Sequence, residues 1–325
     1  MSRTPPAPMG RTTTRDIRAD PGPPLRVEYR PHGPVDLTQT VAVQRRGPGD
    51  PTCAVDEHGT VWRVARTPDG VATLALRARS GAVYGAAWGP GAGWAADNLP
   101  ALCGAADYLD GFNPRAHPVV AEAHRRMPGL RLGRTNRVFD ALAAAIIEQK
   151  VTGLQAFAAW RRIVTWHGER APGPTPRPMF APPAQEDWGR IPSWTWHRAG
   201  LEPPQSRTIV RAAARGESLP AALDSAEPAG RERILTALQG VGPWTAAETA
   251  IRAYGDPDAV SVGDYHLAHA VGYALTGSRT DDDGMLELLE PWRGHRQRVI
   301  RLLLASGPRE PRRGPRLHPE NHRFR

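Results

Sequence analysis

From about residue 109 onward, apolar residues recur every three or four positions along the chain. This spacing places apolar side chains on one face of an α-helix. Nine such segments follow one another, separated by glycine, proline and polar residues: 117–127, 136–149, 153–168, 206–216, 230–239, 243–255, 264–275, 283–292 and 295–306. We therefore predict an all-helical domain over residues 109–307, interrupted by a Pro-rich surface loop over residues 171–186.

Residues 25–108 have a different pattern. β-branched or alternating segments at 35–44, 59–66 and 71–79 are separated by Gly-containing turns, and a short helical run follows at 99–109. Such segments are typical of antiparallel strands. The predicted fold class is therefore α+β, with a small N-terminal antiparallel sheet domain with helices, followed by the all-α domain.

The two ends of the chain, residues 1–24 and 308–325, are rich in Pro and Arg and lack apolar periodicity. We expect them to be disordered basic tails. The whole chain of 325 residues has a formal net charge of +9, carried almost entirely by arginine because Lys150 is the only lysine. A basic balance of this size favours a polyanionic partner such as nucleic acid.

The sequence also excludes several classes of protein. Two cysteines, Cys53 and Cys103, cannot supply the four ligands of a zinc or iron–sulfur site by themselves. The longest apolar run, residues 141–147, is too short to cross a bilayer, and the N-terminus has no apolar stretch of the secretory type. We expect a cytoplasmic protein with no membrane association and no catalytic metal.

The most informative local feature is the segment 238–246, LQGVGPWTA, between two predicted helices. Gly240 and Gly242 permit positive φ angles and a close backbone approach, and Pro243 suits the first turn of the next helix. The exposed amides of such a turn, together with the helix N-terminus, form an anion site suited to a phosphate. An ordinary turn between two helices is the alternative.

A second feature, Asp264, follows Gly242 by 22 residues and opens the predicted helix 264–275. A carboxylate at this position caps the helix. Because a capping carboxylate stays ionised, it could also stabilise a cationic intermediate. Capping and catalysis are compatible, and the residues alone do not choose between capping alone and both roles.

Taken together, the hairpin and the downstream aspartate resemble the helix-hairpin-helix DNA glycosylase superfamily, and specifically its DNA-3-methyladenine glycosylase II family. The resemblance covers most of residues 109–307. It extends through residues 128–153, 196–216, 238–246, 263–267 and 289–307.

The resemblance implies a role for individual residues. Asp264 matches the catalytic aspartate that stabilises the oxocarbenium ion formed as an alkylated purine leaves. Other positions match the base pocket or the DNA-binding elements. Trp244, Trp292, Tyr265 and Glu248 are expected in the base pocket, and Gly240, Val241, Gly242, Thr245, Gln149 and Lys150 are expected at the DNA, with a structural monovalent cation possible at the hairpin.

Two departures from the family pattern affect these expectations. Lys150 is charged, whereas the residue that fills the place of the extruded base is usually apolar in this family. Glu248 stands where some relatives have an aromatic residue, and it could instead form an ion pair with Arg252.

The absence of a lysine from the hairpin predicts the type of reaction. Members of the superfamily that also cleave the strand use a lysine two residues beyond the second hairpin glycine as the amine nucleophile. Trp244 occupies that position here. The resemblance therefore implies a monomeric, monofunctional glycosylase that acts on damaged double-stranded DNA in the nucleoid. The alternatives are a non-catalytic helix-hairpin-helix DNA-binding protein, which needs neither Asp264 nor a pocket, and an oxidised-purine glycosylase.

Overall fold

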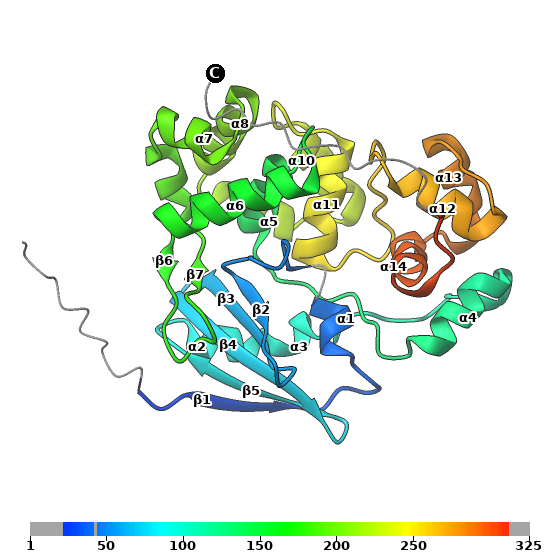
Figure 1. Cartoon of the computed structure of the whole chain (residues 1–325), viewed down its shortest axis with the longest axis horizontal. Coiled ribbons are helices and arrows are strands. Elements are labelled where there is room, and N and C mark those ends of the chain that lie inside the picture. The colour runs from blue at the N-terminus through cyan, green and yellow to red at the C-terminus, as the bar shows by residue number, and fades with distance from the viewer. Residues whose placement is uncertain (1–21, 42–43, 312–325) are drawn as a thin grey trace, which may run out of the picture.

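The computed structural model describes residues 22–41 and 44–311, and in it a five-stranded antiparallel sheet lies below a body of helices (Figure 1). The strand order in the sheet is β1-β5-β4-β3-β2. The strands are β1 (Leu25–Tyr29), β2 (Cys53–Val55), β3 (Val61–Thr67), β4 (Gly70–Arg79) and β5 (Ala82–Trp88). The predicted strands at 59–66 and 71–79 correspond to β3 and β4.

The predicted strand at residues 35–44 is wrong, because residues 37–41 form the short helix α1 (Leu37–Val41). The Asp36 carboxylate accepts a hydrogen bond from the backbone N–H of Gln39 at 3.0 Å, and this stabilises the first helical turn. Leu37 and Val41 lie one turn apart and are buried against the sheet. A helix therefore buries apolar residues of the segment that was predicted to be a strand.

Two further short helices close the sheet domain. They are α2 (Ala92–Asp97) and α3 (Leu99–Leu102). The helical run predicted at 99–109 begins at Leu99 as expected but ends at Leu102, and α2 was not predicted. Leu99, Leu102 and Cys103 join Leu74 and Leu76 of β4 in the core of this domain.

The remaining helices form two groups with separate apolar cores. The hairpin cluster consists of α5 (Val138–Ile147), α6 (Gly153–His167), α7 (Ser193–Ala199), α8 (Pro203–Ala213), α9 (Ser218–Asp224), α10 (Pro228–Thr236) and α11 (Pro243–Tyr254). The C-terminal cluster consists of α4 (Pro118–Arg126), α12 (Leu267–Thr276), α13 (Asp282–Leu289) and α14 (Arg296–Ser306). Figure 1 shows the C-terminal cluster beside the hairpin cluster, with α11 nearest to it.

The helix α5 forms the centre of the hairpin cluster. All ten of its residues except Asp140 are buried, and most are small or aliphatic. A helix that is apolar on all sides must be surrounded by other elements. Helices α6, α8 and α11 pack around it, and the N-terminus of α11 is therefore held in place by the core.

The Pro-rich insertion at 171–186 is not a surface loop along its whole length. It contains β7 (Phe180–Ala181), which pairs with β6 (Glu169–Arg170). Met179 and Ala181 are fully buried against the sheet domain, where they join Val64 and Val71 in a small apolar core. The prolines therefore frame a segment that attaches the hairpin cluster to the sheet.

The terminal segments fall largely outside the described residues, which begin at 22 and end at 311. This applies to the disordered tails predicted over residues 1–24 and 308–325. The described part of the C-terminal segment makes contacts, since Glu310 forms an ion pair with Arg279. Along the stretches that the structure describes, none of the helices has both the length and the apolar character needed to span a bilayer.

A buried ion pair connects the sheet domain to the C-terminal cluster. Asp107 and Arg298 face each other with side chains that are 1% and 2% exposed. The second oxygen of Asp107 also accepts the backbone N–H of Leu132 at 3.0 Å. Both partners are therefore shielded from water. Substituting either one would leave the other charge buried without its partner.

We predict that Asp107→Ala lowers the free energy of unfolding by about 3–5 kcal/mol, because it leaves the Arg298 guanidinium buried without its counter-ion. Urea unfolding followed by circular dichroism measures the change. Glu122→Ala is the matched control, since it removes the exposed ion pairs of Glu122 with Arg125 and Arg126. Equal effects of the two substitutions would contradict a structural role for the buried pair.

Candidate functional site

The turn between α10 and α11 uses a positive φ at Gly240, as its glycines predicted, whereas Gly242 is extended with a φ of −102°. Gly240 has a φ of +93°, and a Cβ atom added there would clash with the Thr208 hydroxyl. Gly242 is exposed and precedes α11, whose N-terminus has no side-chain cap. The first-turn amides of α11 have no intrahelical acceptors, and they form a local positive dipole end at the surface.

The loop after α5 is tied to this turn. The Gln149 side-chain amide donates to the Gly240 carbonyl at 2.9 Å and to the Thr245 hydroxyl at 2.8 Å. Next to it, Lys150 is exposed and has a φ of +54°, a conformation that a lysine rarely adopts. The two predicted DNA-binding segments therefore lie side by side and share hydrogen bonds.

Asp264 lies in front of α12, which begins three residues later than predicted. One carboxylate oxygen accepts the backbone N–H groups of His266 and Leu267, both at 2.9 Å. The other accepts the indole N–H of Trp244 at 3.2 Å. The carboxylate thus joins the first turn of α11 to the start of α12 and is held by three donors.

A cavity of about 470 Å³ opens beside Asp264, between α1, α11, α12 and α14. This volume lies within the range of small-molecule pockets, roughly 300–1,000 Å³. The lining side chains come from all three parts of the molecule. They are Gln39, Glu248, Ile251, Arg252, Ser261, Asp264, His266, Leu267, Ala270, Gln297, Ile300, Arg301, Leu304 and Ala305.

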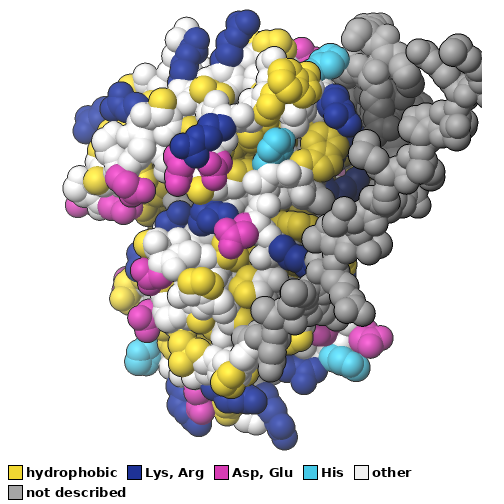
Figure 2. Space-filling view, turned by 90° about the vertical axis from the view of Figure 1, so that its left-hand side faces the viewer, with side chains coloured by type: hydrophobic (Ala, Val, Ile, Leu, Met, Phe, Trp, Pro, Cys, Tyr) yellow, Lys and Arg dark blue, Asp and Glu magenta, His cyan; other side chains and the backbone are white. Residues whose placement is uncertain are grey.

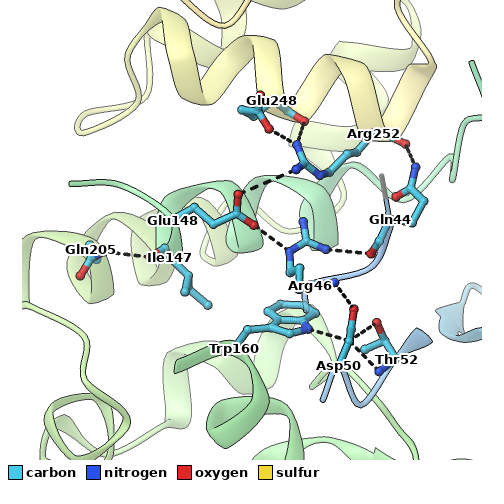
Figure 3. A network of polar contacts seen from close by, with 10 residues as sticks. All are labelled: Gln44, Arg46, Asp50, Thr52, Ile147, Glu148, Trp160, Gln205, Glu248 and Arg252. Carbon is cyan, nitrogen blue, oxygen red and sulfur yellow. Dashed lines mark hydrogen bonds and ion pairs between the residues drawn. The ribbon is translucent and has the colours of Figure 1, made fainter. Parts of the chain in front are cut away.

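Glu248 lies on the cavity surface and belongs to a largely buried network of charges. It forms an ion pair with Arg252 and accepts the Ser261 hydroxyl. Arg252 lies 3.8 Å from Glu148, which binds Arg46 of the sheet domain at 3.0 Å. Figure 3 shows how the alternating charges lead from α11, through the end of α5, to the loop of the sheet domain.

The network determines the ionisation of Glu248. Burial raises the pKa of this carboxyl group, but the Arg252 guanidinium and the Ser261 hydroxyl more than offset burial, so the pKa lies below its usual range. Burial lowers the pKa of Arg252, but Glu248 and Glu148 more than offset that effect and raise it. The pair is therefore charged at neutral pH, and Glu248 is not a free carboxylate of the pocket.

The structure does not place the expected aromatic residues on the cavity. Trp292 is 4% exposed in the core of the C-terminal cluster, and its indole donates to the Asn113 carbonyl at 2.8 Å. Tyr265 is 75% exposed and points away from the core. Trp244 contacts Asp264 but is not among the residues that line the cavity. Of the four residues predicted for the base pocket, Glu248 alone lines this cavity.

Six polar side chains of the cavity were not predicted as site residues: Gln39, Arg252, Ser261, His266, Gln297 and Arg301. Gln297 and Arg301 project from α14, and Gln39 comes from α1. Gln297 and Arg301 are four residues apart, on the same helical face as Leu304 and Ala305. Polar residues on a face that is otherwise apolar were the available signal, whereas Gln39 lay in a segment predicted as a strand.

The chain is similar to known DNA glycosylases in sequence and in structure. No family model matches it. The DNA-3-methyladenine glycosylase of Bacillus subtilis (strain 168) is 24% identical over 183 residues, which is 55% of this chain and 60% of that protein. This chain therefore matches less than two thirds of the length of that relative.

Solved structures match more of the chain. The 3-methyladenine DNA glycosylase from Archaeoglobus fulgidus has a TM-score of 0.69 at 18% identity, covering 86% of this chain and 97% of that one. The apo form of Clostridium acetobutylicum 8-oxoguanine glycosylase/lyase has a TM-score of 0.68 at 12% identity, covering 86% and 95%.

The chain has the fold of the helix-hairpin-helix DNA glycosylases. In this helix-hairpin-helix fold, α10 and α11 are the two helices and residues 237–242 are the hairpin. The predicted α+β class, with a small antiparallel sheet and a large helical part, is confirmed.

The basic charge of the chain is unevenly distributed. Residues 1–21 carry a formal charge of +2 and residues 312–325 carry +4, so only +3 of the total of +9 belongs to the rest of the chain. On the side of the molecule shown in Figure 2, Arg side chains lie among acidic ones and do not form one continuous patch. Any contact of the described residues with a polyanion therefore depends on local geometry more than on net charge.

We predict that Glu248→Gln destabilises the protein by about 1–3 kcal/mol at pH 7, because Glu148, at 3.8 Å, is then the one carboxylate paired with Arg252 among the described residues. The folded-state pKa of Glu248 is depressed, so its contribution is complete above its unfolded pKa and is lost as the pH falls through the folded value. The difference between wild type and variant should therefore shrink in acid, as the pH falls below the usual pKa range of a glutamic acid.

Urea unfolding at several pH values measures this dependence. Glu290→Gln is the control, because it removes an exposed ion pair with Arg293. A difference between wild type and Glu248→Gln that stays constant down to pH 2 would show that the ionised form of Glu248 is not what stabilises the network.

Proposed function

We propose that this chain is a monofunctional DNA glycosylase of base excision repair that extrudes an alkylated purine and hydrolyses its N-glycosidic bond. The observation that carries the proposal is the position of Asp264. Its carboxylate lies at the edge of a cavity, is held by three hydrogen-bond donors, and is directly connected to the helix that follows the hairpin. The name of the Bacillus subtilis relative and the fold support the same activity.

The chemistry requires a fixed negative charge next to the sugar. The C1′–N9 bond breaks and its electron pair leaves with the base, which makes the deoxyribose cationic. Asp264 stabilises this cation, since a preorganised charge in a partly dry site is far more effective than one in water. A water oxygen then bonds to C1′, and a proton from that water ends on the departed base or in solvent.

The hairpin is proposed to hold the DNA backbone. The uncapped N-terminus of α11, with the exposed Gly242, could bind a phosphate through backbone amides. Gln149 and Lys150 lie beside it, where they could fill the place of the extruded base. Extrusion from the stack costs a few kcal/mol, and such contacts would offset part of that cost.

A monovalent cation at the hairpin was implied by the resemblance. The Gly240 carbonyl, one oxygen that such an ion could use, already accepts the Gln149 amide. We therefore derive no step through a cation. Among the residues that the structure describes, no group of three or more His, Cys, Asp or Glu side chains could hold a metal ion.

An oxidised-purine glycosylase with lyase activity is the second candidate. It is favoured by the structural likeness to the Clostridium acetobutylicum 8-oxoguanine glycosylase/lyase. Trp244 at the hairpin position that would supply the amine argues against a lyase reaction, because indole is not a nucleophile of that kind. A purely DNA-binding role would leave the cavity beside Asp264 without a purpose.

We predict that Asp264→Asn lowers the rate of base release from duplex DNA that carries an alkylated purine by at least roughly 100-fold, while DNA binding is retained. Asparagine keeps the shape and the capping oxygen but removes the charge. Single-turnover release of free base, with binding measured by fluorescence anisotropy, separates the two effects.

The control for this experiment is Asp281→Asn. Asp281 caps α13 through the backbone N–H of Gly284 at 3.0 Å and does not line the cavity. It should leave base release unchanged. Unchanged release in Asp264→Asn would remove the catalytic assignment.

We predict that the product strand stays intact until it is heated in alkali, because no lysine lies at the hairpin. Denaturing gels before and after alkali, together with borohydride trapping of a covalent adduct, test this prediction. An adduct that forms with wild type and disappears in Lys150→Ala would show that the single lysine acts as a nucleophile and would overturn the monofunctional assignment.

A further inference from the structure

We propose that the cavity beside Asp264 selects an electrically neutral purine lesion with hydrogen-bond acceptors on its edge, and that Arg301 is the residue that selects it. The inference rests on the proposed glycosylase activity and specifies its substrate. A cationic purine, such as one methylated at N3 or N7, would be a poor occupant of the same cavity.

The lining of the cavity lacks the aromatic faces that bind organic cations. Its apolar side chains are Ile251, Leu267, Ala270, Ile300, Leu304 and Ala305, and none of the lining side chains from the described part of the chain is Trp, Tyr or Phe. The faces of aromatic rings attract a nearby cation by roughly 0.5–2 kcal/mol. Aliphatic surfaces sandwich a flat base without this preference for positive charge.

The carboxylates of the cavity are not available to a cationic base. Both oxygens of Glu248 are engaged, one by the Arg252 guanidinium and the other by the Ser261 hydroxyl. The Asp264 carboxylate accepts three hydrogen bonds and, in the proposed reaction, faces the sugar. Glu248 is thus neutralised by Arg252, and the charge of Asp264 acts on the sugar. Neither carboxylate is free to bind a cationic base.

Arg301 adds a positive charge without a paired carboxylate. Among the contacts of the described residues, the acceptor on its guanidinium is the Gln39 backbone carbonyl at 2.7 Å, and it takes part in no ion pair. Burial, and after it the nearby Arg252, lower the pKa of Arg301 to about 10, and the nearby Glu248 offsets part of this effect, so Arg301 remains protonated at neutral pH and repels a cation placed next to it. A cationic base in the same cavity would experience this repulsion at low effective dielectric.

The same side chain suits a neutral base. A guanidinium only donates hydrogen bonds, so it requires acceptor atoms such as a carbonyl oxygen or an unprotonated ring nitrogen. Gln39 fixes the orientation of Arg301, and the Gln39 and Gln297 side-chain amides, which also line the cavity, can both donate and accept. Gln297 is buried, and Gln39 and Arg301 are partly buried; donors in such a lining disfavour a ligand that leaves them unpaired.

Arg301 also meets the chemical need of a neutral lesion. A cationic purine departs as a neutral molecule, whereas a neutral purine gains negative charge as the C1′–N9 electron pair moves onto it. A guanidinium at the edge of the ring stabilises that charge until a proton from water reaches the base. The feature that weakens binding of cations therefore assists departure of neutral bases.

The test compares four lesions in otherwise identical duplexes under single-turnover conditions. Hypoxanthine and 1,N6-ethenoadenine are the neutral probes, and 7-methylguanine and 3-methyladenine are the cationic ones. With wild type we expect release of at least one neutral base to be accelerated over the enzyme-free rate at least 10-fold more than that of either cationic base. We expect Arg301→Met to reduce neutral-base release by 10- to 100-fold and to leave cationic-base release unchanged or faster.

Two further variants keep the result interpretable. Arg301→Lys retains the charge without the planar fork and should recover only part of the neutral-base rate. Arg125→Met replaces an exposed arginine of α4 outside the cavity and should change neither class of lesion. Arg301→Met retains most of the length of the side chain and its apolar stem. Thermal unfolding shows whether this variant is still folded. If it is not, the rates of Arg301→Lys decide the outcome.

The possible failures are distinct. Preferential release of the cationic bases, or an equal loss of both classes in Arg301→Met with the fold intact, would overturn the assignment of Arg301 while leaving the glycosylase proposal in place. Release of no base from any duplex, with DNA binding retained, would refute the proposed activity itself.

Discussion

The position of one carboxylate, Asp264, depends on two helices at once. One of its oxygens accepts the first amides of α12, and the other accepts the indole N–H of Trp244 in the first turn of α11. Since α11 also carries the hairpin at its N-terminus, the proposed phosphate site and the proposed catalytic group are linked by a few covalent and hydrogen bonds. A rigid connection of this kind is what an enzyme needs to place a charge beside one sugar of a bound strand.

The sheet domain contributes to the site as well as to stability. Arg46, from the loop that leads to β2, enters the charge network that ends at Glu248, and α1 supplies Gln39 to the cavity. The buried pair of Asp107 and Arg298 connects the end of the sheet domain to α14. The cavity is therefore formed where three cores meet, and charged groups rather than apolar contacts fix their relative placement there.

Much of the fold follows from the sequence, because periodicity reports burial directly. The nine predicted helices are present, including α5, which is buried except at Asp140. The strand predicted at 35–44 was wrong because the apolar pattern of this segment fits both a strand and a helix. The local hydrogen bond from the Gln39 backbone N–H to the Asp36 carboxylate favours the helix. The loop predicted at 171–186 was partly wrong because the buried residues of this segment, Met179 and residues 181–183, are too few to produce a detectable period.

The site was predictable only in part, for a different reason. The proximity of the hairpin and Asp264 follows from their separation along the chain and from the resemblance of that spacing to known glycosylases. The composition of the cavity does not follow, because Gln39 and Arg301 are far apart in sequence and meet only through the packing of α1 on α14. Trp292 was placed in the pocket by resemblance, yet its indole is committed to the Asn113 carbonyl in a core.

The most direct test of this account is a crystal structure of the Asp264→Asn variant with a duplex that carries a neutral purine lesion. The account predicts the lesion outside the base stack, with an acceptor atom within 3.2 Å or so of the Arg301 guanidinium. The sugar should face residue 264, and a phosphate should lie at the N-terminus of α11. A complex in which the lesion remains stacked, or in which it occupies a different cavity while the one beside residue 264 contains only solvent, would contradict the account.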